Sequence, residues 1–521
     1  MKAHGLMVSV LWVGLAACMV FDKPLHLSDA GVVRECNTHQ ECTERATSLA
    51  TQQGSGGETV PAVCIEPEGR CAVLLTEDCT VITGDYLDDD AIIIGSMFAT
   101  TGGFGLSPDD AAQRQGSAIL AVEEINGAGG IPGEGGVRHP LVMVSCDDST
   151  DLLRAGSHLA EDLAVPVIVG PTSSSFTINI TQELTSRTKT AVMTPSAAAA
   201  AIADLDDDGL TFQMAPNDGQ RGPLMIHQIN AIEAALRVER AREEIRLAIL
   251  FRDDALGLGT RAALDRLEMN GRTLADPVNL GNSVRIDGYK PGEARWEDLV
   301  SAYLTLKPDI IAIAGVGDTV AGVILPIEAQ WPDGEPRPYY VMIDAMKGPR
   351  LLETTVGNDD LRKRIRGTGV TQTADAVDVN NAFQIAYNAR YPGFSAFAAG
   401  AGSAYDVVYA VAFALAATAD QPPSGASVAE GLGYLSGGQK RVHHKATEIL
   451  GAFTSLSAKE PISAIGTLGA MVWDEHGSML GGGIEVWCIG LPGGAPTFQS
   501  SGLIYDLAAG TVAGEYTQCA P

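Results

Sequence analysis

Hydrophobic and polar positions follow the pattern of a parallel α/β protein from residue 91 onwards. Residues 91–98 (AIIIGSMF) form a continuous apolar run of buried-strand length. Over 109–126, apolar residues recur every three or four positions, which predicts a helix. The same unit then repeats, with strands at 141–145, 167–170 and 191–194 and helices at 151–162 and 174–187. Repeated strand–helix–strand units predict a parallel sheet covered on both faces.

A second series of the same kind begins near Gln220. We predict helices at 220–239, 259–270 and 296–306 and strands at 247–251, 310–314 and 339–343. Residues 367–371 then read as a connector, and 380–390 and 402–417 as Ala-rich helices. Residues 468–489 read as short strands with glycine turns. Two interwoven α/β series predict two lobes, with a ligand cleft at the carboxyl ends of the strands.

The N-terminal residues have the pattern of an export signal. A short basic start precedes an apolar run at 5–17, which is shorter than the roughly 20 residues of a lasting membrane helix. The run ends in Leu-Ala-Ala-Cys, which resembles a bacterial lipobox with Cys18 as the lipidated residue. Acylation would anchor the protein without spanning the bilayer. Met19 in place of Asp favours the outer membrane where a cell has two. An ordinary secretory signal with an incidental cysteine is the alternative.

The remaining cysteines fit an exported protein with disulfides. They are Cys36, Cys42, Cys64, Cys71, Cys79, Cys146, Cys488 and Cys519. Five of them lie between 36 and 79, which predicts a small stapled module, with an irregularly spaced zinc site as the alternative. Because five is odd, we expect Cys79 to pair with Cys146, and we expect Cys488 to pair with Cys519 from position alone.

Composition and missing motifs exclude several classes of function. Of the 521 residues, 64 are Asp or Glu and 35 are Lys or Arg, giving a net charge of −29 that disfavours nucleic acid as a partner. GxSxG, HExxH and GxxxxGK[ST] patterns are absent from the sequence, so we predict no enzyme and no cofactor. The acidic stretch 204–209 lacks the glutamate of a calcium loop, and His443-His444 reads as a solvated loop. We therefore predict no metal site.

Several phrases, taken in order, resemble the type I periplasmic binding proteins of the leucine/isoleucine/valine-binding branch. They are IGSM (94–97) with Thr101-Gly102, GSAILAVEEINGAGG (116–130) with IPG (131–133), DDS (147–149), VGPTSSS (169–175), MTPSA (193–197) and TFQMAPND (211–218). The resemblance covers nearly 400 residues. It implies two doubly wound α/β lobes joined by three crossovers, which would fall near Ala215, near 367–371 and near 469–474.

The N-terminal patterns and the resemblance together set limits for each part of the chain. We predict a lipoprotein signal over 1–18, a Cys-rich module and linker over 19–85, and a C-terminal tail over 496–521. Lobe 1 would combine 86–215 with 367–470, and lobe 2 would combine 216–366 with 471–495.

Ligand-binding residues follow from the resemblance, residue by residue. Ser174, within Ser173, Ser174 and Ser175 at a helix start, matches the serine that contacts a ligand carboxylate, although a helix-capping serine is the alternative. Ala197 and Ala198 stand in the loop that supplies the second contact, where the family tends to carry Thr or Ser. Asp344 aligns with the partner of a ligand ammonium, with a solvated turn as the alternative.

The chain departs from the family at its aromatic positions. The tyrosines that flank the ligand in the family are missing at about Leu256 and at 316–317, and Phe104 in the first loop is the candidate for an aromatic wall. The sequence therefore predicts a solute-binding lipoprotein of an ABC-type importer, taking an amino acid or similar small polar ligand and working with a membrane permease at the cell envelope. The alternative is a scaffold, regulatory or sensory lipoprotein that binds a protein partner with the same fold.

Overall fold

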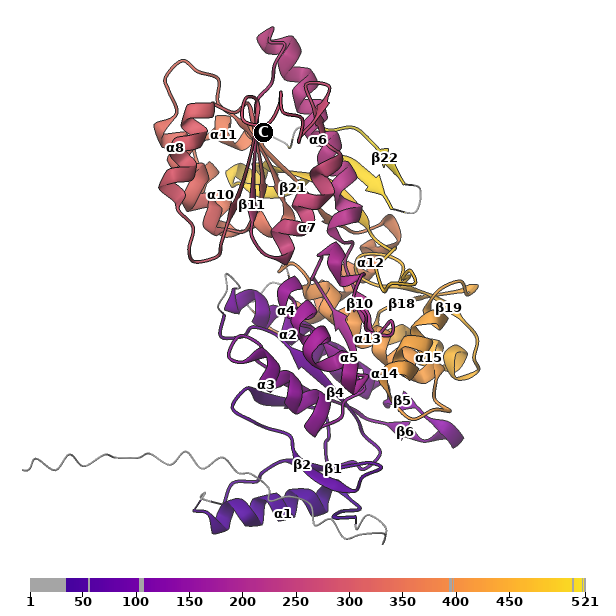
Figure 1. The fold of residues 1–521 in the computed structure, drawn as a ribbon. Helices are drawn as coiled ribbons and strands as arrows, with labels where there is room; N and C mark the ends of the chain where they lie inside the picture. Colours follow the sequence, from indigo (N-terminus) through magenta and orange to yellow (C-terminus); the bar gives the residue numbers. More distant parts are fainter. Residues whose placement is uncertain are drawn as a thin grey trace, which may run out of the picture.

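Two α/β lobes and a small N-terminal module make up the described chain (Figure 1). The computed structural model describes residues 34–54, 57–102, 107–392, 396, 398–507, 510–517 and 519. The predicted signal segment and its Cys18 lie outside these residues. Lobe 1 contains a six-stranded sheet and lobe 2 an eight-stranded sheet, and the N-terminal module lies at the end of lobe 1 that is remote from lobe 2 (Figure 1). Among the described helices, none combines the length and the apolarity that a membrane crossing requires.

The sheet of lobe 1 has the order β10-β9-β8-β4-β7-β3. Its strands are β3 (Cys79–Thr83), β4 (Ile92–Met97), β7 (Leu141–Cys146), β8 (Val167–Val169), β9 (Ala191–Thr194) and β10 (Thr211–Gln213). All neighbours are parallel except the edge pair β3 and β7. Every residue of β7 is buried, as expected for a strand covered on both faces.

Helices from two distant parts of the chain cover this sheet. They are α2 (Pro108–Gly127), α3 (Leu152–Ser157), α4 (Ser174–Ile180), α5 (Ser186–Thr188), α12 (Val377–Arg390), α13 (Ala401–Ala417), α14 (Gly425–Leu432) and α15 (Ile449–Ser457). Every residue of α13 except Gly402 is buried, because its small and apolar side chains let other helices approach on all sides. The short strands β18 (Lys440–His443) and β19 (Ile462–Ile465) form a parallel pair beside it.

His444, which we predict from the sequence to lie in a solvated loop, is fully buried in this layer. Its Nδ1 lies 2.9 Å from Oδ1 of Asp406 on α13, and its ring stacks on Tyr409 with the centroids 5.1 Å apart. The flanking Lys440, Arg441 and Lys445 suggested a surface segment, but the pairing of β18 with β19 turns His444 inward.

The sheet of lobe 2 has the order β14-β11-β15-β16-β17-β20-β21-β22. Its strands are β11 (Leu247–Arg252), β14 (Val284–Tyr289), β15 (Ile310–Ala314), β16 (Tyr339–Ile343), β17 (Ile365–Thr371), β20 (Gly483–Gly490), β21 (Thr497–Asp506) and β22 (Thr511–Ala513). The first five in spatial order are parallel, and β20, β21 and β22 continue the sheet antiparallel. The helices are α6 (Asp218–Arg240), α7 (Ala255–Ala263), α8 (Trp296–Leu306), α9 (Leu325–Gln330), α10 (Pro349–Thr355) and α11 (Asp359–Arg364).

The chain changes lobe after β10, after β17 and before β20, but the details differ from our expectation. Residues 367–371, predicted as a connector, lie in β17 and pair with both β16 and β20. The predicted boundary at 367 therefore falls inside a strand of lobe 2. Trp473 still contacts lobe 1, since its Nε1 donates to the Gln213 carbonyl at 2.9 Å. We interpreted the glycines of this segment as a sign of a connector. In the structure, Gly367 instead leaves room for the ring of Trp487.

Four disulfides join the described cysteines. Cys36–Cys64 and Cys42–Cys71 connect α1 (His39–Gln52) to the hairpin of β1 (Ala62–Ile65) and β2 (Arg70–Val73), which confirms the stapled module. The sulfur atoms of Cys36, Cys42 and Cys64 lie close together, but each belongs to a disulfide rather than to a set of free metal ligands. The predicted pairs Cys79–Cys146 and Cys488–Cys519 are both present.

Packing around Gly367 gives a testable prediction. A Cβ at Gly367 would lie 2.3 Å from Cζ2 of the buried Trp487 and 2.5 Å from the Met342 carbonyl oxygen. We expect Gly367→Ala to lower the free energy of unfolding by on the order of 3 kcal/mol, because neither neighbour can move cheaply. The matched control is Gly127→Ala at the end of α2, where a Cβ has no neighbour within 4 Å. Urea unfolding of both variants measures the difference, and equal midpoints would contradict the packing described.

Candidate functional site

The predicted ligand-binding residues come together where the two lobes meet. Ser173, Ser174 and Ser175 follow β8, and residues 197–201, which we name the alanine loop, follow β9. Asp344 follows β16 in lobe 2. All of them therefore lie at carboxyl ends of parallel strands, the edge at which α/β proteins bind ligands. Phe104 lies outside the described residues.

Ser174 and the alanine loop are in direct contact. Oγ of Ser174 accepts the backbone N–H groups of Ala198 and Ala199, each at 3.1 Å, and Ser174 is 5% exposed. These N–H groups are the ones expected to hold a ligand carboxylate, and they are already bonded within the protein. A hydroxyl that accepts two bonds can still donate its proton, so Ser174 retains the capacity to bond an anion.

Capping does not explain the serines. Ser173 is the N-cap residue of α4, but its side chain makes no capping hydrogen bond. Ser173 and Ser175 are both partly exposed, whereas Ser174 is buried. The three serines therefore differ in environment, and Ser174 is the one that connects two loops of lobe 1.

The first three residues of the alanine loop, Ala197 to Ala199, are buried. Ala197 and Ala199 pack in one apolar cluster with Ala255, the first residue of α7. Nε2 of Gln213 donates to the carbonyls of Ala197 and Ala199 at 2.9 and 3.2 Å, and the N–H of Asp218 donates to the Ala198 carbonyl at 2.7 Å. The last bond joins lobe 1 to the first turn of α6. Small side chains in the alanine loop let the two lobes approach this closely.

Asp344 is neither an open carboxylate nor a solvated turn residue. Nη1 of Arg221, from the first turns of α6, donates to Oδ1 of Asp344 at 2.8 Å. The Arg221 side chain is 8% exposed and that of Asp344 is 19% exposed. Arg221 also donates from Nε to the Pro216 carbonyl at 2.8 Å. The position expected to face a ligand ammonium therefore already has an internal cation beside it.

Sequence reasoning missed two buried carboxylates near this junction. Asp148, just after β7, is 2% exposed, and neither of its oxygens has a hydrogen-bond partner among the described residues. Burial raises the pKa of Asp148 to about 7, Asp147 adds to the increase, and Arg114 opposes it. Burial likewise raises the pKa of Asp218 to about 7. The DDS phrase indicated the family, but nothing in it distinguishes a buried Asp148 from an exposed one.

Asp147, the neighbour of Asp148 in the sequence, holds the loop that follows β4 in lobe 1. Asp147 accepts the N–H of Thr101 at 2.7 Å, the hydroxyl of Thr100 at 3.0 Å and the N–H of Ser149 at 2.9 Å. Burial acts to raise the pKa of Asp147, but hydrogen bonds from Ser149 and Thr101 together outweigh it and keep that pKa below its usual value. Asp147 and Asp148 are therefore neighbours with opposite environments.

Lobe 2 also contains a buried tyrosine that sequence reasoning did not single out. Tyr289 ends β14, is 3% exposed, and its hydroxyl donates to Oδ1 of Asp318 at 3.1 Å. A Cβ at Gly315 would lie 2.8 Å from the same hydroxyl oxygen. Since β14 is an edge strand that pairs with β11 and not with β15, the position of Tyr289 beside residues 315–318 could not be inferred from spacing.

Solved structures with the same architecture identify the fold. The branched-chain amino acid substrate-binding protein LivJ from Streptococcus pneumoniae, in complex with isoleucine, matches with 17% identity and a TM-score of 0.53, covering 79% of this chain and 99% of its own. The leucine-binding protein LivK from Thermotoga maritima matches with 15% identity and a TM-score of 0.55, covering 79% of this chain and 98% of its own.

A third similar structure binds a different kind of ligand. An ABC-transporter solute-binding protein from Rhodopseudomonas palustris, in complex with 3,4-dihydroxybenzoic acid, matches with 14% identity and a TM-score of 0.55, covering 82% of this chain and 99% of its own. No protein-family model and no curated protein sequence matches the chain. The chain has the type I periplasmic binding fold, as the sequence predicts.

Burial of Asp148 predicts a specific pH dependence of stability. The folded-state pKa of about 7 lies above the ordinary value of 3.8, so burying this carboxyl costs stability increasingly as pH rises from about 4 to 7. Asp148→Asn removes that cost. We expect its effect on the free energy of unfolding to be more favourable at pH 8 than at pH 5 by about 2 kcal/mol.

Urea unfolding of wild type and Asp148→Asn at the two pH values measures this difference. Asp333→Asn, in an exposed turn before β16, is the matched control and should show no such difference. An effect of Asp148→Asn that is equal at pH 5 and pH 8 would show that Asp148 is ionised in the folded protein across this range.

Proposed function

We propose that this protein is a non-enzymatic solute-binding protein of an ABC-type importer, with its ligand bound between the lobes. The observation that carries the proposal is the fold, since similar structures are substrate-binding proteins of such transporters. The ligand is an amino acid or a similar small carboxylate. Ser174 would donate its hydroxyl proton to the ligand carboxylate at the carboxyl end of β8.

Recognition of a carboxylate has more support than recognition of an ammonium. Asp344 is paired with Arg221, so a ligand ammonium would have to share Asp344 with an arginine. Similar structures hold isoleucine in one case and 3,4-dihydroxybenzoic acid in another, and only the carboxylate is common to both ligands. We therefore include carboxylates without an amino group in the proposed ligand class.

The contact between the lobes is the element that a ligand would bias. Ala255 of lobe 2 packs on the alanine loop of lobe 1, which brings the lobes together at that point. A ligand shifts a two-lobed protein towards the closed arrangement only if it binds that arrangement more tightly. The closed arrangement would then present both lobes to a membrane permease.

Envelope location and anchoring are part of the same proposal. Export would follow from the signal segment, and acylation of Cys18 would hold the protein on a membrane surface, with the outer membrane favoured by Met19. Four disulfides agree with an oxidising compartment.

A second candidate is a scaffold, regulatory or sensory lipoprotein that binds a protein partner. One observation favours it. Both side chains expected to contact the ligand already have hydrogen-bond partners within the protein. Ser174 accepts from the amides of Ala198 and Ala199, and Asp344 accepts from Arg221. A fold in which these groups pair with one another can keep its two lobes together without a ligand.

Thermal unfolding with a panel of small carboxylates distinguishes the two candidates. We expect leucine, benzoate or a related acid to raise the melting temperature of the protein beginning after Cys18. A ligand at 100 times its Kd adds about 2.7 kcal/mol of stability. Ser174→Ala should weaken binding about tenfold or more, because a hydrogen bond to a charged group is worth about 1.5–3 kcal/mol.

Each variant is compared with its own ligand-free melting temperature. Ser173→Trp, at the partly exposed N-cap of α4, is a second test because it adds a bulky side chain next to Ser174. Ser301→Ala, on the exposed surface of α8, is the matched control. A shift that survives both Ser174→Ala and Ser173→Trp would place the ligand elsewhere, and no shift with any acid would favour the partner-binding candidate.

A further inference from the structure

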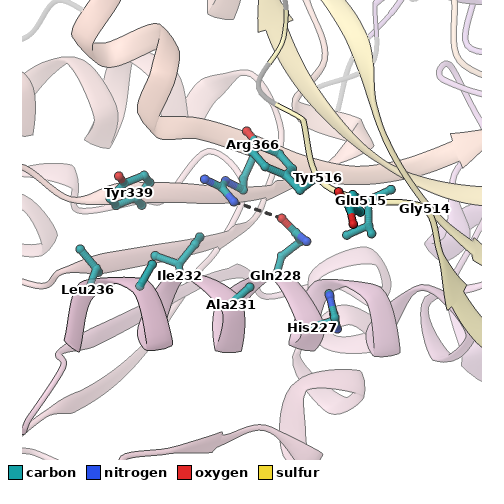
Figure 2. Close-up of a pocket in the computed structure, with 12 residues that line it drawn as sticks. His227, Gln228, Ala231, Ile232, Leu236, Tyr339, Arg366, Gly514, Glu515 and Tyr516 are labelled. Atoms are coloured by element: carbon teal, nitrogen blue, oxygen red, sulfur yellow. Dashed lines mark hydrogen bonds between the residues drawn. The ribbon is translucent and has the colours of Figure 1, made fainter. Parts of the chain in front are cut away.

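A pocket of about 460 Å³ lies in lobe 2 between α6 and the C-terminal part of the chain (Figure 2). Its floor is apolar and is formed mainly by one face of α6. The apolar lining residues are Ala231, Ile232, Ala235, Leu236 and Leu503. Polar groups gather at one end of the pocket, where Arg366, Gln228, Glu515 and Tyr516 lie (Figure 2). An apolar cavity with a few convergent polar groups is the usual form of a small-molecule site.

Arg366 has aromatic rings as its main neighbours rather than an anionic partner among the described residues. The guanidinium lies 4.0 Å from the ring centroid of Tyr516 and 5.6 Å from that of Tyr339. No carboxylate among the described residues forms an ion pair with it, and its Nε is buried without a hydrogen-bond partner there. Burial lowers the pKa of Arg366, and only the two tyrosines oppose that effect. In a chain of net charge −29, an arginine left without a carboxylate is unexpected.

Gln228 supplies a second unused donor beside it. Gln228 projects from α6 and is 1% exposed, and its Oε1 accepts a hydrogen bond from Nη1 of Arg366 at 3.3 Å. Its Nε2 is buried and has no hydrogen-bond partner among the described residues. A buried donor without an acceptor is costly, so a ligand that brings an acceptor here gains that energy back. Guanidinium and amide donors together match the oxygens of a carboxylate.

This pocket is separate from the lobe junction. Tyr339 begins β16 and Arg366 lies near the start of β17, whereas Asp344 follows the end of β16. The two sites thus lie at opposite ends of the parallel strands. The length of a five-residue strand separates them, which is about 16 Å. Leu503 of β21 and residues 514–516, which follow β22, close one side of the pocket. The C-terminal segment that forms this wall is attached to β20 by the disulfide Cys488–Cys519.

We propose that this pocket is a second ligand site, which binds a small organic monocarboxylate with an apolar body. The carboxylate would pair with Arg366 and accept from Gln228, and the apolar body would lie along α6 between Ile232 and Leu503. Because Nε of Arg366 is covered, the ligand reaches it by displacing the ring of Tyr516. A dianion such as phosphate fits less well, since one guanidinium would leave a second charge buried without a partner. This inference does not depend on the proposed importer function.

Isothermal titration calorimetry of the whole purified chain with 3-phenylpropionate tests the proposal. We expect saturable binding that weakens at least tenfold in Arg366→Gln and persists in Ser174→Ala, which separates this site from the lobe junction. The neutral isostere 3-phenylpropanamide should bind at least tenfold more weakly than the acid. Arg272→Gln, an exposed arginine on the β12 (Glu268–Met269) and β13 (Arg272–Thr273) hairpin, removes the same charge elsewhere and should leave binding unchanged.

Gln228→Glu keeps the proposal testable if Arg366→Gln does not fold. This variant places a carboxylate of the protein beside Arg366, where it would act as a built-in occupant. We expect it to raise the melting temperature of the ligand-free protein and to abolish binding of 3-phenylpropionate. The proposal is overturned by absence of saturable binding in wild type, by a loss smaller than tenfold in Arg366→Gln, by equal binding of the amide, or by unchanged binding in Gln228→Glu.

Discussion

The hydrogen bonds between Ser174 and the alanine loop are the constraint on which the junction of the two lobes depends. A loop buried to this extent needs an acceptor for each of its backbone N–H groups. Ser174 accepts two of them, and the carbonyls of the same loop receive donors from Gln213 and from Asp218. The alanine loop is thereby held in place, and its buried residues Ala197 and Ala199 pack against Ala255 at the start of α7.

Charge at the junction follows a consistent rule despite the strongly acidic composition. Arg221 enters from the first turns of α6 and meets Asp344, while Asp218 beside it is buried with a raised pKa. In lobe 1, Arg114 opposes the raised pKa of Asp148 in a similar way. Buried cations are therefore placed where carboxylates would otherwise repel one another. Arg366 differs from these arginines because its guanidinium lies over two tyrosine rings and forms no ion pair with a carboxylate among the described residues.

Much of the fold could be predicted from periodicity, because buried parallel strands and their helices leave continuous or 3.6-residue apolar patterns. The strands at 310–314 and 339–343 and the helix at 296–306 have the bounds that the sequence predicts. The prediction at 367–371 was wrong because glycine has two uses. It is common in connectors, but in a strand such as β17 its missing side chain also leaves room for a neighbouring residue. The prediction of a solvated loop at His444 was also wrong, because the charged residues next to it in sequence are not buried as His444 is.

Chemistry at the site was harder to infer, for physical reasons. Ser174, Ala198 and Asp344 could be placed at strand ends from the resemblance, but their partners lie far along the chain. The Arg221–Asp344 pair spans 123 positions, and no local pattern in the sequence reports it. Burial of Asp148 and Gln228 depends in the same way on contacts that form only in the folded protein. The residues that lie at the strand ends could be predicted, whereas the hydrogen-bond partners that they have within the folded protein could not.

The antiparallel end of the lobe 2 sheet has a consequence for how molecules of this protein meet one another. All eight residues of β20 are buried, and its outer edge would be a template for pairing with a strand of another chain. The ten-residue β21 covers that edge, and the sheet then finishes with β22, which has only three residues. A strand so short offers few backbone groups for edge-to-edge pairing. The C-terminal segment therefore protects the protein against self-association, and a chain ending at Gly490 would be prone to aggregate through its exposed β20.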